Sequence, residues 1–277
     1  MTPSGRMPIL IDDLDDPRVV CFRDVRDADL RGREKLFMAE SELVVRRLLA
    51  SPDRLYALFL SPQKYERLRD ALRDLPESVP VYCAKVELMS AIAGFHIHRG
   101  VLAAGNRPRA EELTLDRALD HLRQQSSCTL LLAEGMTNVD NMGGLFRNAA
   151  AFGVDGVVLD PTCCDPLYRK AIRVSMGHVL SVPYAVSGDW PGDLDRLKKE
   201  WGVQLIAAEV IPNARSLWEI PKHEKTAILF GSEGKGLTHK PLKLCDAVGA
   251  IPMTATVPSL NVAVASAVFL YELRRDS

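Results

Sequence analysis

The feature that constrains the fold of this chain most is an alternation of short apolar runs and helical patterns near its carboxyl end. Residues 227–230 and 247–251 are apolar runs of strand length, and each is followed by small and polar residues and then by a helical pattern. Strands and helices that alternate in this way build a parallel sheet covered by helices. Ligands of such folds bind outside the carboxyl ends of the strands. We therefore expect a binding site in the loops that follow these two runs.

The loop after the first run is rich in glycine. Residues 231–236 read GSEGKG, with three glycines in six positions. Glycine permits positive φ angles and allows a ligand to approach the main chain closely. The order of the glycines fits neither the dinucleotide-binding fingerprint nor the P-loop. A ligand-binding loop and a tight connection without a ligand are both compatible with this pattern.

An apolar helix is predicted from about residue 260 to residue 270. Pro258 restricts Val257 to extended geometry, and Ser259 is a suitable N-cap. Almost every residue of the predicted helix is apolar or small, so we expect it to be buried on all sides. Asn261 is a polar exception in the first turn. Its amide is either satisfied by the neighbouring backbone or part of a ligand site at the helix N-terminus.

Composition indicates a globular protein with one large domain or two ordinary ones. The chain has 277 residues, of which 47% are hydrophobic and 26% charged. No apolar run approaches the roughly 18 residues that a membrane span needs, and residues 1–16 do not resemble a signal peptide. The six cysteines are scattered without a C-x-x-C pair. We therefore expect reduced thiols in a cytoplasmic protein, with no membrane association and no zinc site.

Charge gives no general indication of a nucleic-acid partner, because the formal net charge is −1. His96 and His98 would share one face of a strand, but no third metal ligand is evident nearby, so we predict a polar strand end and no metal. Their position before Arg99 also permits contact with a phosphate backbone. A second local patch of arginines either binds RNA or forms a solvated face interleaved with aspartates; it comprises Arg18, Arg23, Arg26, Arg31 and Arg33.

The first part of the chain, residues 1–107, is predicted to form a small α/β domain that binds the substrate. Helices are expected from Ser41, from about residue 62 to residue 72, and from residue 87 to residue 93. Residues 108–125 are predicted to form a linker and a lead-in helix that starts near Leu113. Strands are predicted at residues 36–39, 55–60, 79–83 and 100–104.

The remaining residues, 126–277, are predicted to form a second domain that opens with a βαβ unit. Asn141 lies in the loop of this unit, and Arg147 lies in the helix that follows. Two glycines, Gly143 and Gly144, weaken the first turn of that helix, which suggests that something packs close to its backbone. The apolar neighbours of Arg147 favour a position among buried residues over a surface arginine. Strands are expected at residues 128–133, 156–159, 179–186 and 203–208, and helices at residues 142–152, 166–176 and 194–201.

Three stretches together resemble motifs of the SpoU–TrmH family of RNA ribose 2′-O-methyltransferases, which belongs to the knotted SPOUT class. Residues 141–147 resemble the family's N-x-G-x-x-x-R, and residues 229–237 resemble its G-[NSA]-E-G-x-G-[LM] stretch. Residues 251–253 together with residues 259–262 resemble the third motif. The likeness extends over about residues 128–274 and includes residues 172–177. Residues 20–105 are similar to the family's N-terminal substrate-binding domain, which resembles ribosomal-protein RNA-binding folds.

The resemblance implies an enzyme that transfers a methyl group from S-adenosylmethionine to a ribose 2′-hydroxyl in RNA. It implies a homodimer, a deep trefoil knot in the parallel-sheet domain and ribosomal RNA of the 23S type as substrate, with transfer RNA second and DNA excluded. Catalytic residues carried over from the motifs are Asn141, Arg147, Glu233, Ser259 and Asn261. The residues implied to hold the cofactor are Ala208, Leu229, Gly231, Ser232, Ile251, Met253 and Leu260.

This sequence departs from the family pattern in two places and raises one question of mechanism. Ala263 stands where many relatives carry serine, and residues 138–140 replace an Asp-Pro-Gly-like turn. The family assigns proton abstraction to the arginine, here Arg147. A guanidinium is effectively always protonated in proteins, so we expect Arg147 to bind a phosphate of the target and to stabilise the forming alkoxide instead.

Three other functions remain compatible with parts of the sequence. A ribosome-associated RNA-binding factor could retain the fold with a degenerate cofactor pocket, although the presence of Asn141, Arg147, Glu233 and Asn261 disfavours degeneracy. A nucleotide-dependent oxidoreductase is disfavoured by the order of the glycines and by the lack of an evident ribose-binding acid. Methylation of a base is disfavoured by the three motifs together.

Overall fold

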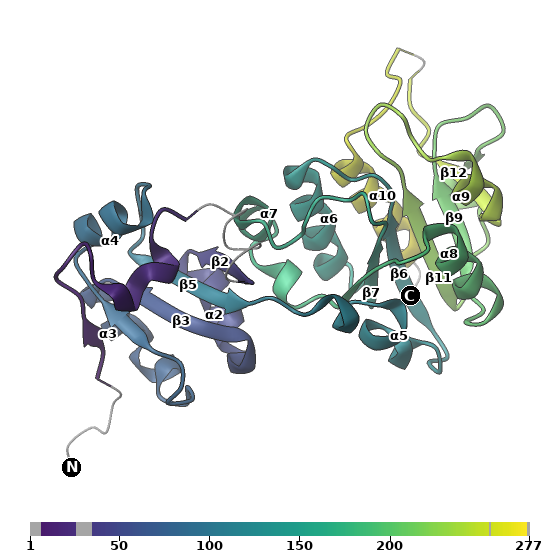
Figure 1. The fold of residues 1–277 in the computed structure, drawn as a ribbon. Coiled ribbons are helices and arrows are strands. Elements are labelled where there is room, and N and C mark those ends of the chain that lie inside the picture. The colour runs from purple at the N-terminus through teal and green to yellow at the C-terminus, as the bar shows by residue number, and fades with distance from the viewer. Residues whose placement is uncertain (1–6, 26–34, 255, 276–277) are drawn as a thin grey trace. The chain divides into compact units, whose positions relative to one another are not determined.

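A computed structural model describes residues 7–25, 35–254 and 256–275 of the chain (Figure 1). Contacts between residues divide it into two compact units. The first comprises Met1–Arg107 and Leu167–Leu180, and the second comprises Pro108–Pro166 and Ser181–Ser277. The first unit is therefore not contiguous in sequence, because a segment that follows the second unit's β7 packs with the amino-terminal residues. The two domains predicted from the sequence, residues 1–107 and 126–277, were instead each one continuous segment.

The first unit contains a mixed five-stranded sheet. The adjacent strands β4 and β3 pair in parallel, and β1 pairs in parallel with β4 on its other side. β5 pairs antiparallel with both β3 and β2. Apolar side chains from both ends of the unit pack on this sheet, including Phe22, Phe59 and Met89. In the order of the sheet, the strands are β1 (Ile9–Leu10), β4 (Val81–Cys83), β3 (Leu55–Leu60), β5 (Val101–Asn106) and β2 (Leu36–Glu40).

The helices of the first unit begin and end at residues with evident local signals. Ser61 accepts a hydrogen bond from the Lys64 N–H at the start of α3, and Pro62 occupies its first turn. Gly94 ends α4 with a φ of 72°. The elements are η1 (Pro17–Phe22), α2 (Glu42–Leu49), η3 (Pro52–Arg54), α3 (Pro62–Leu72), α4 (Val86–Ala93), α7 (Arg169–Val174) and η6 (His178–Leu180).

The segment that contains α7 and η6 differs from the prediction. The predicted helix over residues 166–176 is shorter, because Met176 and Gly177 have φ angles of 54° and 82° and end it. The predicted strand over residues 179–186 is too long, since its first residues form η6 and only Tyr184–Val186 form a strand, β8. Arg47 holds this turn by donating a hydrogen bond from Nε to the carbonyl of Met176 at 3.0 Å.

The second unit is built on a seven-stranded sheet in which every pairing is parallel, as the alternation of strands and helices predicted. β11 lies at the centre, between β9 and β6, and its side chains are buried on both faces. In the order of the sheet, the strands are β10 (Arg215–Ser216), β12 (Ala247–Ala250), β9 (Gln204–Ala208), β11 (Lys225–Phe230), β6 (Cys128–Ala133), β7 (Gly156–Leu159) and β8 (Tyr184–Val186).

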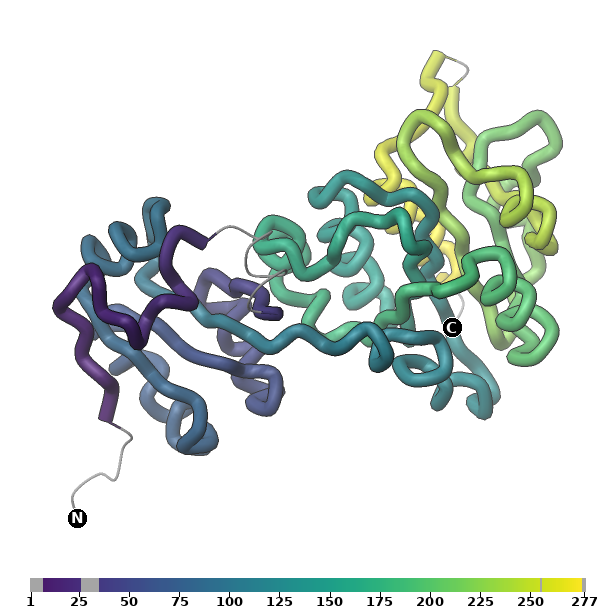
Figure 2. The backbone as a smooth tube through the Cα atoms, viewed as in Figure 1, coloured from purple at the N-terminus to yellow at the C-terminus, as the bar shows by residue number. Residues whose placement is uncertain are grey.

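Helices cover this sheet, and Figure 2 shows the chain passing from β11 through α9 and β12 to α10. The helix predicted from Leu113 is two short pieces, α5 and η5. The elements are η4 (Ala110–Glu112), α5 (Leu115–Ala118), η5 (Asp120–Leu122), α6 (Val139–Ala151), α8 (Trp190–Lys199), η7 (Leu217–Glu219), α9 (His239–Leu244) and α10 (Val262–Arg274).

The glycine pair in α6 lets α10 pack close to it. A Cβ atom added to Gly144 would lie 2.6 Å from the Cβ of Ala263, which is nearer than any real contact of this kind. Asn148, one turn further along α6, donates hydrogen bonds to the Ala263 carbonyl and to the Ser266 hydroxyl. The close approach that the two glycines predicted is therefore present, and Ala263 lies at its centre.

Two predictions about α10 are wrong. Its N-cap is Asn261 rather than Ser259, because the side-chain Oδ1 of Asn261 accepts hydrogen bonds from the N–H groups of Ala263 (2.9 Å) and Val264 (3.3 Å). The helix is also not buried on all sides, since Val264, Val268 and Tyr271 are 51%, 38% and 60% exposed. At spacings of four and three residues these three form one exposed stripe. The composition of a helix shows which residues can be buried, but not what covers them.

Three further predictions concerned a pair of histidines, a patch of arginines and the absence of a membrane span. His96 and His98 lie in the connection between α4 and β5 rather than on a strand, with ring centroids 4.4 Å apart. Arg18 and Arg23 pair with Asp16 and Asp15, while Arg26, Arg31 and Arg33 lie outside the described residues. Within the described part of the chain, no helix is long and apolar enough to cross a membrane.

Candidate functional site

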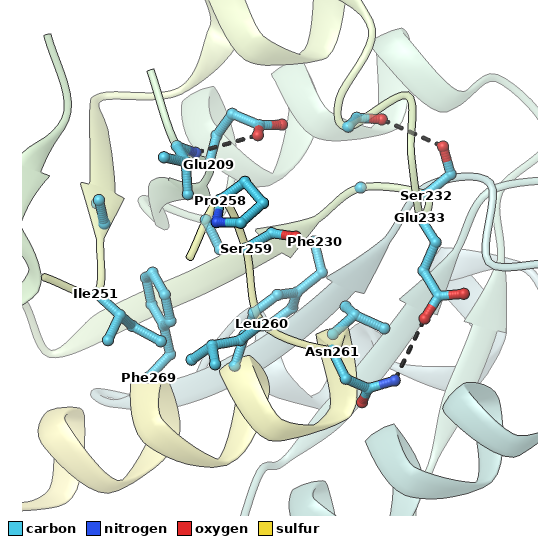
Figure 3. A pocket seen from close by; sticks show the side chains of 18 of the residues that line it. Glu209, Phe230, Ser232, Glu233, Ile251, Pro258, Ser259, Leu260, Asn261 and Phe269 are labelled. Carbon is cyan, nitrogen blue, oxygen red and sulfur yellow. Dashed lines mark hydrogen bonds between the residues drawn. The ribbon is translucent and has the colours of Figure 1, made fainter. Parts of the chain in front are cut away.

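A cavity of about 470 Å³ lies at the carboxyl ends of β9, β11 and β12, in the size range of small-molecule sites (Figure 3). Three separate stretches of the chain contribute to its lining, the first at residues 208–210, the second at residues 230–234 and 236, and the third at residues 249–251, 253 and 258–262, and α10 closes one side with Ala265 and Phe269. The two apolar runs at residues 227–230 and 247–251 therefore lead into loops that meet at one cavity, as the position of ligand sites in α/β sheets predicts.

Most of the residues that the family resemblance assigns to the cofactor line this cavity. Leu229 is the exception, because its side chain is fully buried within β11, and the neighbouring Phe230 takes its place in the lining. Sequence reasoning missed Glu209 and Phe269. Assigned residues found in the lining are Ala208, Gly231, Ser232, Ile251, Met253 and Leu260.

Each glycine of the GSEGKG loop is required by its geometry. A Cβ atom on Gly231 would lie 2.4 Å from the carbonyl carbon of Gly236, because the loop turns back on itself and Ser232 bridges to Gly236. Gly234 and Gly236 have φ angles of 84° and 64°, which L-residues rarely adopt. Although a tight connection alone would explain these glycines, the same loop also forms one wall of the cavity.

Two carboxylates from neighbouring strand ends hold the far end of this loop. Glu209, directly after β9, accepts a hydrogen bond from the Leu237 N–H at 3.0 Å and another from the Val210 N–H at 3.1 Å. Glu134, directly after β6, is 6% exposed and accepts from both the N–H and the hydroxyl of Thr238. The loop is thus fixed by side chains that come from other parts of the sequence.

Three of the predicted catalytic residues form one hydrogen-bonded cluster beside the cavity. The buried Asn141 of α6 donates from Nδ2 to Oε1 of Glu233. Asn261 donates from its Nδ2 to the Oδ1 of Asn141 at 2.9 Å and to the same Glu233 oxygen at 3.3 Å, a contact that Figure 3 shows. These residues lie 92 and 120 positions from Asn141 in sequence.

The cluster can orient a hydroxyl group. Both amides are used to hold Oε1 of Glu233, so the carboxylate has a fixed direction while the residue itself remains exposed. An oriented carboxylate oxygen accepts a hydrogen bond from an alcohol and positions it against a group in the neighbouring cavity.

Ser259 and Arg147 are placed differently from these three. Ser259 lines the cavity and is exposed. Arg147 is exposed on α6, does not line the cavity, and makes no hydrogen bond or ion pair with a described residue, so the prediction that it lies among buried residues is wrong. Its neighbours Leu145 and Phe146 are buried. Because residues six positions apart on a helix point in different directions, the burial of Asn141 and of these neighbours does not extend to Arg147.

The six cysteines are free thiols. Burial raises the pKa of Cys164 to about 11 and that of Cys245 to about 12, and it raises the pKa of Cys163, which lies in the loop after β7, even further. A thiolate is the reactive form of cysteine, so these three side chains are not nucleophiles at neutral pH. The chemistry of the site rests on amides, a carboxylate and hydroxyl groups.

Comparison with known proteins agrees with the resemblance read from the motifs. The SpoU rRNA methylase family matches residues 129–271, which is more than half of the chain. An uncharacterized tRNA/rRNA methyltransferase of Mycobacterium tuberculosis is 42% identical over 271 residues, covering 95% of this chain and 91% of the relative. The chain belongs to the SpoU family.

More distant relatives carry more specific names. A 23S rRNA (guanosine-2′-O-)-methyltransferase of Neisseria meningitidis is 28% identical, and the match covers 83% of this chain and 91% of that protein. An AdoMet-bound rRNA methyltransferase from Sinorhizobium meliloti has the same fold, with a TM-score of 0.78, 23% identity, and coverage of 96% of this chain and 97% of that one.

Proposed function

We propose that this protein transfers the methyl group of S-adenosylmethionine to a ribose 2′-hydroxyl of structured RNA, with ribosomal RNA of the 23S type as the first expected substrate and transfer RNA as the second. The observation that carries this proposal is the cluster of Asn141, Glu233 and Asn261 beside the cavity. Three residues implied to be catalytic, from three separate motifs, meet there. The amides of Asn141 and Asn261 hold the carboxylate of Glu233. Names of relatives that are 23S rRNA 2′-O-methyltransferases support the same reaction.

The cavity fits S-adenosylmethionine by its chemistry. Ile251, Leu260 and Phe269 supply apolar surface for an adenine ring, and the glycines of the 231–236 loop leave main-chain groups free of side chains. We propose that the backbone of Gly231, Ile251 and Leu260 encloses the adenosine part, with Ser232, Met253 and Ala208 beside it. When bound, the cofactor supplies an activated methyl group on a positively charged sulfur. Crystal structures of fold relatives with AdoMet bound support this assignment.

The protein side of the reaction is positioning. Glu233, held by Asn141 and Asn261, accepts a hydrogen bond from the target hydroxyl, and Ser259 at the cavity wall orients the same group. Orientation of this kind can contribute up to roughly 7–11 kcal/mol in favourable cases. The guanidinium of Arg147 is exposed and pairs with no described residue, so it is suited to a phosphate of the target and to the charge that develops on the ribose oxygen.

A pH–rate profile distinguishes this role of Arg147 from general base catalysis. In Arg147→Lys, a limb of the bell-shaped profile that moves with the substitution would favour the arginine as the base. A lower rate with unchanged limbs is the expected result, because a lysine retains the positive charge but not the planar fork of donors. The rate is measured from methyl incorporation at fixed RNA concentration between about pH 6 and pH 10.

We propose a homodimer as the working form, with α10 in the interface. The stripe of Val264, Val268 and Tyr271 is an exposed apolar face on a helix that packs against the helix of Arg147. Sedimentation velocity tests this directly. Val268→Glu is expected to shift the protein from dimer to monomer without loss of the fold, because the residue is 38% exposed in the single chain. A wild-type protein that is monomeric at micromolar concentration contradicts the proposal.

Two finer structural features also belong to the proposal. The first is that residues 126–277 form a methyltransferase domain with a deep trefoil knot, and the convergence of residues 230–236 and 249–262 on one cavity supports it. The second is that residues 1–107 form a substrate-binding domain, joined by residues 108–125. A crystal structure in which the carboxyl-terminal segment lies unthreaded would overturn the first. RNA binding that survives removal of residues 1–107 would overturn the second.

Incubation with S-adenosylmethionine labelled in the methyl group, using separate pools of unmodified ribosomal and transfer RNA, tests the reaction. We expect label in one RNA pool, at a phosphodiester bond that resists alkali, since a methylated 2′-oxygen cannot attack the neighbouring phosphate. Label on a base would contradict ribose specificity. Cofactor binding without any transfer would support the alternative of a non-catalytic RNA-binding factor.

A further inference from the structure

A second concave surface lies in the first unit, where α2, α3 and the connection before β5 border a groove of about 620 Å³. Four permanently charged cations line it: Arg46 of α2, Lys64 and Arg67 of α3, and Arg99 of the connection. Glu42 is the one carboxylate in the described lining, so the groove carries a net charge of +3 with His98 neutral. The whole chain has a net charge of −1, which makes this concentration of positive charge local.

A partly buried carboxylate organises three of these cations. The side chain of Glu42 is 14% exposed and pairs with Lys64 at 2.9 Å, Arg46 at 3.0 Å and Arg67 at 3.0 Å. The hydrogen bond from Lys64 holds the pKa of Glu42 below its ordinary value, so it is ionised at neutral pH. One carboxylate cannot neutralise three cations, and it therefore fixes their positions while leaving surplus positive charge.

The connection before β5 adds a cation that has no partner among the described residues. Arg99 is exposed and makes no hydrogen bond or ion pair with any described residue. Arg67 extends toward solvent, with its side chain 65% exposed while it remains anchored to Glu42. Such an arrangement, with fixed cations around a concave surface, attracts an extended anion rather than a single carboxylate.

We propose that this groove binds the sugar–phosphate backbone of the substrate RNA, with Arg67 and Arg99 contacting phosphates and Glu42 keeping the groove in shape. This inference rests on the proposed function, because it supplies the RNA that the second unit methylates. No Phe, Tyr or Trp is found in the described lining, so base stacking is not expected there. The aliphatic side chains of Leu43 and Val86 also line the groove and suit the ribose face of a backbone.

The double variant Arg67→Ala/Arg99→Ala tests the groove, and the chain offers a matched control. Arg69 and Arg73 also lie on or directly after α3, but they pair with Glu66 and Asp70 and do not line the groove. The control Arg69→Ala/Arg73→Ala removes the same charge from the same helix region. RNA affinity is measured by fluorescence anisotropy at several salt concentrations, with the RNA that the wild type methylates, and cofactor affinity by calorimetry.

Loss of two phosphate contacts has a characteristic result. We expect the groove variant to bind RNA about tenfold more weakly at 100 mM salt, and its slope of log K against log salt to fall in magnitude by about 1.5. The control is expected to stay within about twofold of the wild type. S-adenosylmethionine affinity should be unchanged in both, because the cavity lies in the second unit.

The outcomes separate this inference from the proposed function. If the wild type methylates RNA but the groove variant and the control have equal affinities and slopes, the groove inference is overturned while the function stands. If the wild type neither binds S-adenosylmethionine nor methylates any RNA, the proposed function fails first. Weakened affinity without a change in the salt slope would also overturn the inference, since it would show that no phosphate contact was lost.

Discussion

The cavity has two walls that are held in different ways. The loop of residues 231–238 is fixed from outside, by Glu134 and Glu209 at the ends of neighbouring strands and by glycines that let it turn back on itself. In the segment of residues 251–261, most described residues are exposed and their hydrogen bonds to one another are local, such as Val257 N–H to the Thr254 carbonyl at 3.0 Å. Asn261 ends this segment and links it to Glu233 of the other wall.

This difference suggests how the site combines rigidity with access. A wall held by buried or partly buried carboxylates is organised before a ligand arrives, so little ordering is needed on that side. A wall with few fixed hydrogen bonds has lower local stability and can adjust around a bound molecule. The contact between Asn261 and Glu233 is then the point where the adjustable wall is joined to the fixed one. Substitutions at four positions test this comparison.

Replacement of Asn261 should have the largest effect, because it removes the link between the walls. We expect Asn261→Ala to lower the rate of methyl transfer by about 100-fold, since the carboxylate of Glu233 loses a partner that orients it. It also removes the N-cap of α10, worth about 1 kcal/mol, and should lower the Tm by about 2–4 °C. Methyl incorporation and thermal unfolding measure the two effects.

Asn261→Asp separates these two roles of the side chain. Aspartate still accepts from the N–H groups of Ala263 and Val264, so the Tm should stay near that of the wild type. It cannot donate to Asn141 and it places a second negative charge beside Glu233, so the rate should remain as low as in Asn261→Ala. A fully active Asn261→Asp enzyme would show that the link between the walls has no catalytic role.

Replacement of Gly231 tests the fixed wall. The Cβ of Gly231→Ala would overlap the main chain of Gly236, so the loop must open, at about 2 kcal/mol. We expect S-adenosylmethionine to bind roughly 30-fold more weakly by calorimetry. Gly234→Ala is the matched control, since its φ of 84° strains an alanine but its surroundings are open. Its effect should be smaller, about 1 kcal/mol, and equal losses in both variants would contradict a steric cause.

How well the sequence predicted an element depended on whether a local pattern or the packing against other elements determines it. β3, β6 and β7 were predicted to the residue, because buried strands of a sheet read as apolar runs between turn signals. The strand predicted over residues 179–186 failed because an apolar run of this length cannot distinguish a strand from a turn followed by a shorter strand. The all-round burial predicted for α10 failed because periodicity does not say what packs against an apolar face.

Site residues that belong to sequence motifs could be predicted, whereas residues that tertiary contacts bring to the site could not. Asn141, Glu233 and Asn261 were identified from their motifs, although nothing in their spacing required them to share hydrogen bonds. Glu134 and Glu209 were missed, because their partners lie 104 and 28 residues away. A signal was present in each case, since both carboxylates come directly after a buried strand of the parallel sheet, at the edge where ligands bind.

Replacement of Glu209 should have a moderate effect on the fixed wall. Each of its two carboxylate oxygens accepts from a backbone N–H, and the amide nitrogen of Glu209→Gln cannot accept, so one N–H loses its partner. A cost of about 1 kcal/mol corresponds to about fivefold weaker cofactor binding. Glu224→Gln removes an exposed carboxylate just before β11 and serves as the control for charge. If both variants bind the cofactor equally, Glu209 does not support the loop.

Replacement of Thr254 in the adjustable wall should have the smallest effect. Thr254 is exposed and its hydroxyl contacts Thr256 at 3.3 Å, so Thr254→Ala removes a contact that solvent can replace. Exposed substitutions of this kind change stability by less than about 0.5 kcal/mol, which predicts cofactor affinity within about twofold of the wild type and a Tm within about 1 °C. A tenfold loss of affinity would mean that this segment is held as rigidly as the 231–238 loop. The two walls would then be equivalent, and adjustment around the ligand would have to come from elsewhere in the second unit.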